Sequence, residues 1–513
     1  MAPRRLVWPP LVSPASPALE LDPGVLALVV VTLPLLGAGC LLIVGRRAAN
    51  VGWPIAAGTL TITVVLAGAL AGALLTADPI GYRVPVGLEG LSLSVRADGF
   101  SGVIVLLDSL LVVGVLAYTR TAGPRGNGFY VGYLIFVACM YGIALTGGLF
   151  SLYLFVAGMV WTAAALVATT REGWTSYLAL KYLLLGSVGN AIYLLGVAVV
   201  LAATGALNMD VVAGRVSSVG YAEPAIVAAF VLMTVGMGIN IGLFPLHTWL
   251  ADAHAGAPDA VSALLSGVIP ATTVYAFSRI VFTVFTTDFL AANPTVTTGV
   301  LYGAVVTMLA GNVYAFFHTN VKFVLAYSTI SQSGLVVVGI AIANEAAIFG
   351  AIVQLFGHGV IKAGLCVLAG MFALRFGARS LEEYAGLADR APIMAVTFAA
   401  LGVAMIGLPP TVGFVGKWYI AVGALEEGLW LVAALVVVST LLSLGYVVPF
   451  LNQLYFRRAD DPAADSGGVT RGMVIAVVLA AVVALAMGVA SAWLETVLQT
   501  ALEELAQPGV GTG

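Results

Sequence analysis

Four lysines are the residues whose type and placement point most directly to chemistry. They are Lys181, Lys322, Lys362 and Lys417, and each falls within or at the end of an apolar stretch. The other 17 of the 21 basic residues are arginines, and these supply essentially every loop cation. Arginine stays charged in any site, whereas a lysine taken out of water can release its proton. This segregation is typical of a protein that needs its lysines to titrate.

Two of the lysines lie well inside apolar stretches. His358 and Lys362 are four residues apart, so they share one face of a helix. Lys417 follows the interrupted segment Gly407-Leu408-Pro409-Pro410. Ionisable groups within a membrane span are costly and are functional-site hypotheses by default.

Three further ionisable residues admit two interpretations each. Lys181 and Lys322 lie nearer to the ends of their apolar stretches, where snorkelling to the membrane surface is as good an explanation as function. Asp108 lies in the middle of a stretch, where it is either a proton site or counter-charge, or a protonated side chain bonded to a neighbouring helix.

A second interruption lies in the first half of the chain. Gly238, Gly242 and Pro245 break an apolar helix, and His247 and Asp252 follow. Backbone groups freed by such a break cannot be satisfied by lipid, so the break must be buried in protein or line a wet path. On these residues alone, the stretch is a candidate ion pathway.

The composition indicates that the stretches containing these residues lie in a membrane. Of the 513 residues 61% are hydrophobic and 9% charged, against about 25% charged in a soluble domain. Cys40, Cys139 and Cys366 are isolated, so no metal, cluster or disulfide spacing is present, and we expect no cofactor and no catalytic residue. The net charge of −3 gives no indication of a nucleic acid partner.

The sequence predicts an all-α polytopic membrane protein of about fourteen transmembrane helices, since about 20 apolar residues span a bilayer. The predicted spans are 24–44, 52–77, 98–118, 128–147, 149–169, 175–203, 223–247, 258–283, 297–317, 322–343, 346–374, 391–423, 428–455 and 472–497.

The two interruptions divide most of the chain into two blocks of five helices. The first block is 128–283 and the second block is 297–455, and the fourth helix of each is broken. Paired Gly and Pro interruptions indicate an inverted-repeat transporter; because five is odd, the blocks enter the membrane from opposite sides. The remaining predicted segments are an irregular tail at 1–22, helices 1 to 3 in 23–127 with a short extracellular hairpin at 78–97, and a final helix and tail in 456–513.

Loop arginines predict the orientation. One face carries Arg46, Arg47, Arg120, Arg125, Arg171, Arg375, Arg379, Arg390, Arg457, Arg458 and Arg471. The other carries Arg4, Arg5, Arg83, Arg96, Arg215 and, near a helix end, Arg279. The first face is predicted to be cytoplasmic, which places both termini outside the cell membrane.

Five motifs together resemble the antiporter-like subunits of Mrp-type cation/proton antiporters, respiratory complex I and membrane-bound hydrogenases. They are Asp98–Ser101; Phe244–Ala253 with Ala257-Pro258 and Val261–Gly267; Lys322–Gln332; His358–Ala363; and Gly407–Pro410 with Gly413–Lys417. The resemblance covers about 98–455 and implies two inverted bundles, each with a broken helix, around a hydrated polar axis. His358 with Lys362-Ala363 is most similar to the D-type Mrp subunit and its hydrogenase relatives.

The chain departs from this family in the first block. Ala157 stands where the family has a glutamate in helix 5. Asn240 and Ala271 stand where it has lysines. The second block keeps Lys322, His358, Lys362 and Lys417.

The resemblance implies roles for the surviving residues. In the family's logic a buried lysine gains or loses its proton as a neighbouring charge changes, and two charges a few ångströms apart interact by about 4 kcal/mol at intermediate effective dielectric. We therefore expect Lys362 and Lys417 to be the central proton sites, His358 a relay and Lys322 the cation that admits or couples protons. His247 and Asp252 would orient water at the first break, and Asp108 is the candidate replacement for the missing carboxylate.

Three functions fit these features. The first is a D-like subunit of an Mrp-type antiporter, with other membrane subunits as partners and protons and candidate sodium ions as cargo. The second is a membrane-arm subunit of complex I or a hydrogenase, which would make the chain part of a translocase. The third is a scaffold paralogue that pumps nothing. A stand-alone enzyme is not expected, because nucleotide loop, metal constellation and soluble domain are all missing from the sequence.

Overall fold

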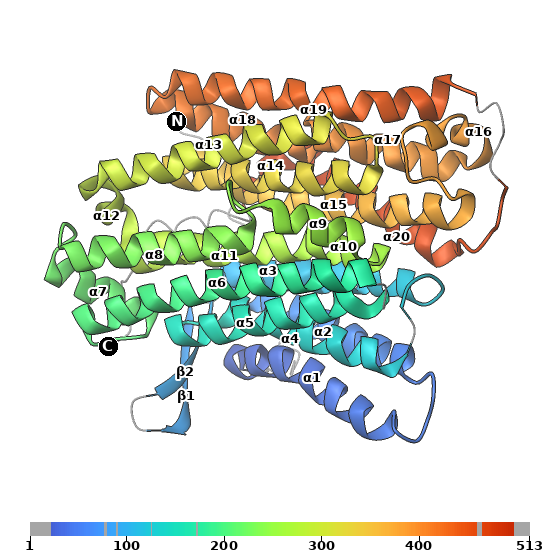
Figure 1. Ribbon diagram of the computed structural model, residues 1–513. Coiled ribbons are helices and arrows are strands. Elements are labelled where there is room, and N and C mark those ends of the chain that lie inside the picture. The colour runs from blue at the N-terminus through green and yellow to red at the C-terminus, as the bar shows by residue number, and fades with distance from the viewer. Residues whose placement is uncertain are drawn as a thin grey trace, which may run out of the picture.

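The computed structural model describes residues 22–75, 79–88, 91–124, 126–170, 173–458 and 464–496 (Figure 1). The predicted N-terminal tail, apart from residue 22, and the tail from Ala501 onward lie outside these residues. Within them, 13 helical segments are long and apolar enough to cross a membrane, and α17 is a shorter apolar helix. The prediction of a multi-pass all-α membrane protein is confirmed.

Twelve of the spans are single helices. They are α1 (Pro23–Val44), α2 (Gly52–Leu74), α3 (Gly99–Thr119), α4 (Asn127–Leu145), α5 (Leu149–Val167), α6 (Gly173–Thr204), α8 (Pro224–Ile241), α13 (Pro294–Phe316), α14 (Val321–Ile342), α15 (Glu345–Phe376), α19 (Trp430–Phe456) and α20 (Arg471–Val489). The thirteenth is composite. It runs from α10 (Asp259–Ala263) through the π-helical η2 (Leu264–Val268), α11 (Ile269–Arg279) and the π-helical η3 (Ile280–Phe285) to α12 (Thr286–Ala292).

Both predicted interruptions are real breaks. α8 ends at Ile241, Gly242 adopts a left-handed conformation with φ 84°, and α9 (Thr248–Gly256) follows. In the second block α17 (Pro392–Ile406) ends at Gly407, with φ 85°, and α18 (Val412–Glu426) follows. A side chain at positive φ is strained, so glycine suits both positions.

The backbone groups freed by the breaks find partners within the protein. At the first break the Phe244 N–H donates to Thr307 Oγ1 at 3.1 Å, and the Trp249 indole N–H donates to the Ile239 carbonyl at 2.9 Å. At the second break the Ile406 carbonyl accepts from the Lys417 ammonium at 2.7 Å. Carbonyl groups at corresponding helix ends are thus satisfied by an indole in one block and by a lysine in the other.

The predicted hairpin is present and is joined to the helices by charge. β1 (Ile80–Leu88) and β2 (Leu91–Ala97) pair antiparallel. Arg96, at the end of β2, pairs with Asp98 at 3.2 Å and also with Asp210. Asp210 lies on α7 (Met209–Val219), an amphipathic helix in the segment between two predicted spans, where the sequence indicates only a loop.

The position of Arg279 removes one arginine from the count of loop charges that was used to predict the orientation. The sequence places it near a helix end with the loop cations, but it is only 3% exposed within the composite helix and pairs with the fully buried Asp98. Because its charge is taken up inside the protein, Arg279 says nothing about which side a loop faces.

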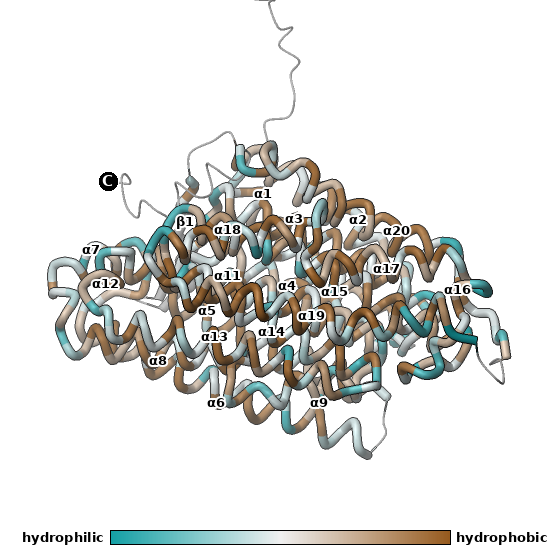
Figure 2. The backbone as a smooth tube through the Cα atoms, turned by 90° about the horizontal axis from the view of Figure 1, so that it is seen from above, coloured by the Kyte–Doolittle hydropathy of each residue, from teal (hydrophilic) through white to brown (hydrophobic). Residues whose placement is uncertain are grey.

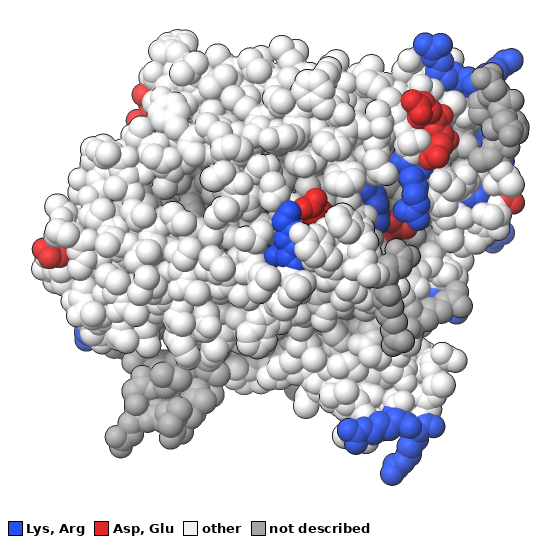
Figure 3. Space-filling model, viewed as in Figure 1, with Lys and Arg blue, Asp and Glu red and all other residues white. Residues whose placement is uncertain are grey.

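The helices lie side by side, and α15 is enclosed by its neighbours (Figure 1). Every residue of α15 from Ala347 to Phe372 is buried, and so is every residue of the composite helix from Ala260 to Phe285. Figure 2 shows apolar colour along the middle of the helices and hydrophilic colour gathered toward the ends, near α7 and α16 (Leu387–Arg390). Lys and Arg gather at the α16 end (Figure 3).

Candidate functional site

A polar face runs along the buried helix α15. Gln354, His358, Lys362 and Cys366 follow one another at intervals of four residues, and all four are buried. Residues four apart on a helix lie on the same face, and twelve residues rise by about 18 Å. Because the hydrocarbon core is about 30 Å thick, this face covers more than half of the membrane depth.

Lys362 lies near the middle of this face and contacts α14. Its ammonium donates to the Leu325 carbonyl at 3.0 Å and to the Ser328 hydroxyl. The next residue, Thr329, shares a hydrogen bond of 2.6 Å with Ser266 of η2. Lys362 is fully buried, and its hydrogen-bond partners among the described residues are uncharged oxygens.

His358 and the glutamines continue the polar face. Gln354 Nε2 donates to Gln332 Oε1 of α14 at 2.6 Å. Neither ring nitrogen of His358 makes a hydrogen bond to a described residue, although the Ser266 backbone faces the ring. Gln332 Nε2 and Gln354 Oε1 are also buried without a protein partner. Buried polar groups left unpaired by protein are commonly satisfied by ordered water, so this region suits a hydrated path.

Lys417 lies at the second break, beside the same face. Its ammonium caps the end of α17, as described above, and its side chain is 4% exposed. Neighbouring Gly416 lies so close to Gln354 that a Cβ atom there would approach Oε1 to 2.5 Å. The structure therefore brings together α17, α18 and the polar face of α15.

Lys322 lies in an ion pair and does not simply snorkel. Its ammonium lies 2.9 Å from Asp259 of α10 and donates to the Ala257 carbonyl at 2.6 Å. Tyr118, from α3, donates to the same aspartate at 3.4 Å, and Arg379 approaches it to 4.0 Å. Four segments thus meet around Asp259.

Sequence reasoning missed two members of this end of the site. Asp259 was not recognised because its partners come from distant segments. His254 of α9 is fully buried, and its Nε2 lies 3.5 Å from Cys366 Sγ at the end of the polar face. The signal for His254 was its position directly after the Phe244–Ala253 motif, two residues after Asp252.

The first block contains amides and alanines at the lost positions. Asn240 Nδ2 donates to Asn190 Oδ1 of α6 at 2.9 Å. Ala157 and Ala271 are buried, at 6% and 0% exposure. Neither an amide nor a methyl group can take up and release a proton near neutral pH.

The auxiliary residues near the first break separate into an ion pair and a ring stack. Lys181 of α6 lies 2.5 Å from Asp252 of α9, with both side chains about one-third exposed. His247 packs its ring against Phe244 and Tyr314, with centroids 5.3 and 5.6 Å apart. Figure 3 shows the corresponding charge over the α9 region of an otherwise largely uncharged middle of this face.

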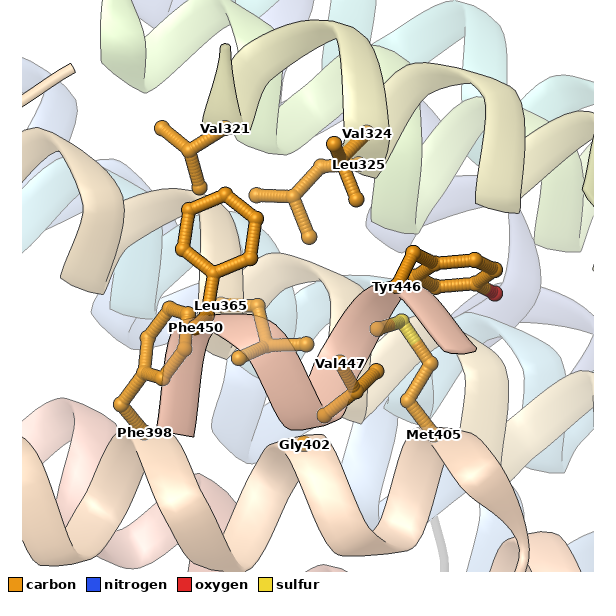
Figure 4. Close-up of a pocket in the computed structure, with 10 residues that line it drawn as sticks. All are labelled: Val321, Val324, Leu325, Leu365, Phe398, Gly402, Met405, Tyr446, Val447 and Phe450. Atoms are coloured by element: carbon orange, nitrogen blue, oxygen red, sulfur yellow. The ribbon is translucent and has the colours of Figure 1, made fainter. Parts of the chain in front are cut away.

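A small cavity near the polar face is apolar. Leu325 and Leu365 line it together with Phe398 and Phe450, and Tyr446 contributes the one hydroxyl among the side chains drawn (Figure 4). The Leu325 side chain points into this cavity while its carbonyl binds Lys362. The cavity therefore offers packing space beside the lysine rather than a polar binding site.

Comparison with known proteins gives a consistent result. The family model described as NADH:quinone oxidoreductase/Mrp antiporter, TM matches residues 146–443. NADH-quinone oxidoreductase subunit N of Desulforudis audaxviator is 33% identical over 416 residues, covering 80% of this chain and 82% of the relative. The D-type subunit of the Na(+)/H(+) antiporter of Bacillus subtilis is 27% identical over 431 residues, covering 83% and 85%.

The fold agrees with a solved structure. A chain of the Mrp complex from Dietzia sp. DQ12-45-1b superposes with a TM-score of 0.86 at 24% identity, covering 94% of this chain and 98% of that chain. At this identity the likeness concerns the fold. Taken with the family match, it shows that the chain is an antiporter-like membrane subunit belonging to the NADH:quinone oxidoreductase/Mrp antiporter transmembrane family.

Proposed function

We propose that this chain is a D-like, proton-translocating subunit of a multisubunit Mrp-type cation/proton antiporter. One observation carries the proposal: Lys362 and Lys417 are buried beside one polar helix face, with their ammonium groups against uncharged oxygens. An aspartate partner would hold a lysine in its charged form, whereas neutral oxygens leave it able to lose the proton. Lys362 and Lys417 would therefore be the central proton sites.

The other residues of the second block would serve these two lysines. His358, one helical turn from Lys362, would relay protons between Lys362 and Lys417 through water. Lys322 would admit or couple protons, because its pairing with Asp259 can open when a nearby charge changes. His247 and Asp252 would orient water at the first break. The division into two inverted five-helix blocks, 128–283 and 297–455, is part of this proposal.

The choice of an Mrp-type complex rests on a motif and a relative. His358 with Lys362-Ala363 resembles the D-type subunit, and the Bacillus subtilis relative is named as that subunit of a sodium/proton antiporter. Other membrane subunits would be the partners, with sodium a candidate for the exchanged cation. We place the complex in the cell membrane with both chain termini outside, because the arginine-rich end would face the cytoplasm.

A second candidate is favoured by the Desulforudis audaxviator relative, which is 33% identical and is named as subunit N of NADH-quinone oxidoreductase. In that case redox chemistry in partner subunits would drive the same proton path. A third candidate, a non-pumping scaffold, is favoured by Ala157, Asn240 and Ala271 at the lost positions.

Proton flux through the native complex in sealed membrane vesicles tests the proposed path. Lys362→Ala and Lys417→Ala should each abolish driven proton uptake, and the control Arg46→Ala should retain it, because Arg46 is exposed and lies in a loop outside the path. Full uptake by both Lys362→Ala and Lys417→Ala would refute the proton-site assignment and favour the scaffold.

Purification of the native complex tests which assembly the chain serves. Co-purifying small membrane subunits and cation-driven proton flux would support the antiporter. Co-purifying redox subunits and proton flux driven by electron transfer would instead identify the respiratory alternative.

A further inference from the structure

Asp108 is a buried carboxyl group that the proposed path does not use. It is the tenth residue of the 21-residue helix α3, and its exposure is 0%. Thr272 of α11 donates to Oδ2 at 2.6 Å, while Oδ1 has no hydrogen-bond partner among the described residues. No ion pair joins Asp108 to a described cation. Burying a bare carboxylate costs much more free energy than burying the neutral acid.

The position of Asp108 joins the two blocks. Its partner Thr272 directly follows Ala271, where the family resemblance expects a lysine. On the other side, Leu107 and Leu111 of α3 lie next to Gly359, which follows His358 on α15. A Cβ atom at Gly359 would lie 3.2 Å from both Leu111 and the Gly267 carbonyl. Three helical segments therefore pack against one another near Asp108: α3, the η2–α11 segment and α15.

The groups that face Asp108 are few. Tyr141 of α4 is the titratable side chain that interacts with it, and the Tyr141 hydroxyl lies 2.8 Å from that of Ser109. Helix α15, which packs against α3, carries the ionisable residues His358 and Lys362. Helix α2 contributes no ionisable residue to this contact.

We propose that Asp108 is a proton-binding residue at the junction of the two blocks. Oδ1 takes up one proton to give the neutral carboxylic acid and releases it to give the carboxylate, which the Thr272 hydroxyl then stabilises through Oδ2. Asp108 would thus supply a proton-binding carboxyl group to a chain that has Ala157 where the resemblance expects a glutamate. This inference rests on the proposed function, because Asp108 would exchange protons with the path on α15.

The test uses the native complex with Asp108→Asn, Asp108→Glu, Thr272→Val and the control Ser109→Ala. Asp108→Asn should lower driven proton uptake by about a hundredfold or more, the scale expected for losing a positioned proton carrier. Asp108→Glu and Ser109→Ala should retain uptake. If Asp108 is only a structural hydrogen-bond acceptor, the amide of Asp108→Asn can replace it, and unchanged uptake in that variant overturns the inference.

Difference infrared spectroscopy keeps the test decisive if Asp108→Asn does not assemble. Reversing the pH gradient across the vesicles should change a protonated-carboxyl carbonyl band in the native complex, and this band should shift in Asp108→Glu and Thr272→Val. A spectrum without a gradient-dependent, Asp108-assigned band contradicts the proposal. If Lys417→Ala loses proton uptake while Asp108→Asn keeps full uptake, only the inference about Asp108 is contradicted. If Lys362→Ala and Lys417→Ala both keep full uptake, the proposed function is contradicted.

Discussion

The four lysines are of two kinds once their partners are known. Lys181 and Lys322 each pair with an aspartate, Asp252 and Asp259. Lys362 and Lys417 instead donate to carbonyl and hydroxyl oxygens and are almost fully buried. The type of partner therefore separates two lysines in ion pairs from two lysines whose partners among the described residues are uncharged oxygens.

Ser328 should matter through Lys362. Its hydroxyl accepts from the Lys362 ammonium, and a hydrogen bond to a charged group is worth about 1.5–3 kcal/mol. Ser328→Ala should therefore slow driven proton uptake by the complex about tenfold. Ser333→Ala is the matched control, since Ser333 is equally buried on α14 but has no hydrogen-bond partner for its hydroxyl among the described residues. Equal rates in the two variants would show that Ser328 does not support Lys362.

At the scale of single elements, both breaks have exposed loop residues, and helix α20 contacts the second break. Gly488 of α20 lies so close to the second break that a Cβ atom would come within 2.1 Å of the Pro410 carbonyl oxygen. At the first break, Phe244 and Leu246 are 41% and 43% exposed. At the second break Leu408 is 38% exposed, and Pro409 and Pro410 are exposed as well. Lys417 itself is only 4% exposed, so the lysine is shielded although the loop before it is open.

Residues 379–381, which pair with the residues just before Lys322, should become less protected in acid because of Glu383. The N–H groups of Arg379 and Ser380 donate to Glu383 at 2.6 and 2.7 Å and hold the pKa of that carboxyl below its ordinary 4.5. Because the folded-state pKa is lowered, the stabilisation is complete above pH 4.5 and is lost as pH falls through the lower value. Hydrogen exchange at residues 379–381, corrected for intrinsic rates, should therefore accelerate in acid.

Glu383→Gln provides the control for this pH effect. In that variant the exchange of residues 379–381 should be faster at neutral pH and should lose its acid dependence. These residues pair with 319–321, because the Val321 N–H donates to the Arg379 carbonyl at 2.9 Å. An acid dependence that persists in Glu383→Gln would assign the effect to another group.

The sequence predicted those features that local composition determines. Apolar length located the spans, and Gly and Pro located both breaks to within a few residues of Gly242 and Gly407. The α7 helix was missed because its apolar residues form only one face of a short segment. Asp259 and the Lys181–Asp252 pair were missed because their partners are about 60 to 140 residues away in sequence. No periodicity reveals a contact of that kind.

At the scale of the whole molecule, a buried charge network joins the hairpin to the helices. Arg279 of α11 pairs with Asp98 at the start of α3, and Arg96 connects Asp98 to Asp210 on α7. Arg279 and Asp98 are 3% and 0% exposed. The ion pairs of this network include none of the polar residues on α15. We therefore assign the network a structural role.

Removing Arg279 should destabilise the fold. Arg279→Leu would leave Asp98 buried beside only Arg96, and breaking a buried ion pair costs about 3–5 kcal/mol. The melting temperature of the purified complex should fall clearly, while the exposed control Arg46→Ala should leave it unchanged. An unaltered melting temperature in Arg279→Leu would mean that Arg96 alone compensates for Asp98.

The most direct test of the account asks whether Lys362 and Lys417 change their protonation. Nitrogen-15 NMR of lysine side chains in the assembled complex can provide this, with each signal assigned by its loss in the matching Lys→Arg variant. We predict that the Lys362 and Lys417 signals switch between charged and neutral forms when the proton gradient is reversed, while the Lys181 signal does not change. Lys362 and Lys417 signals that remain charged throughout would contradict the account.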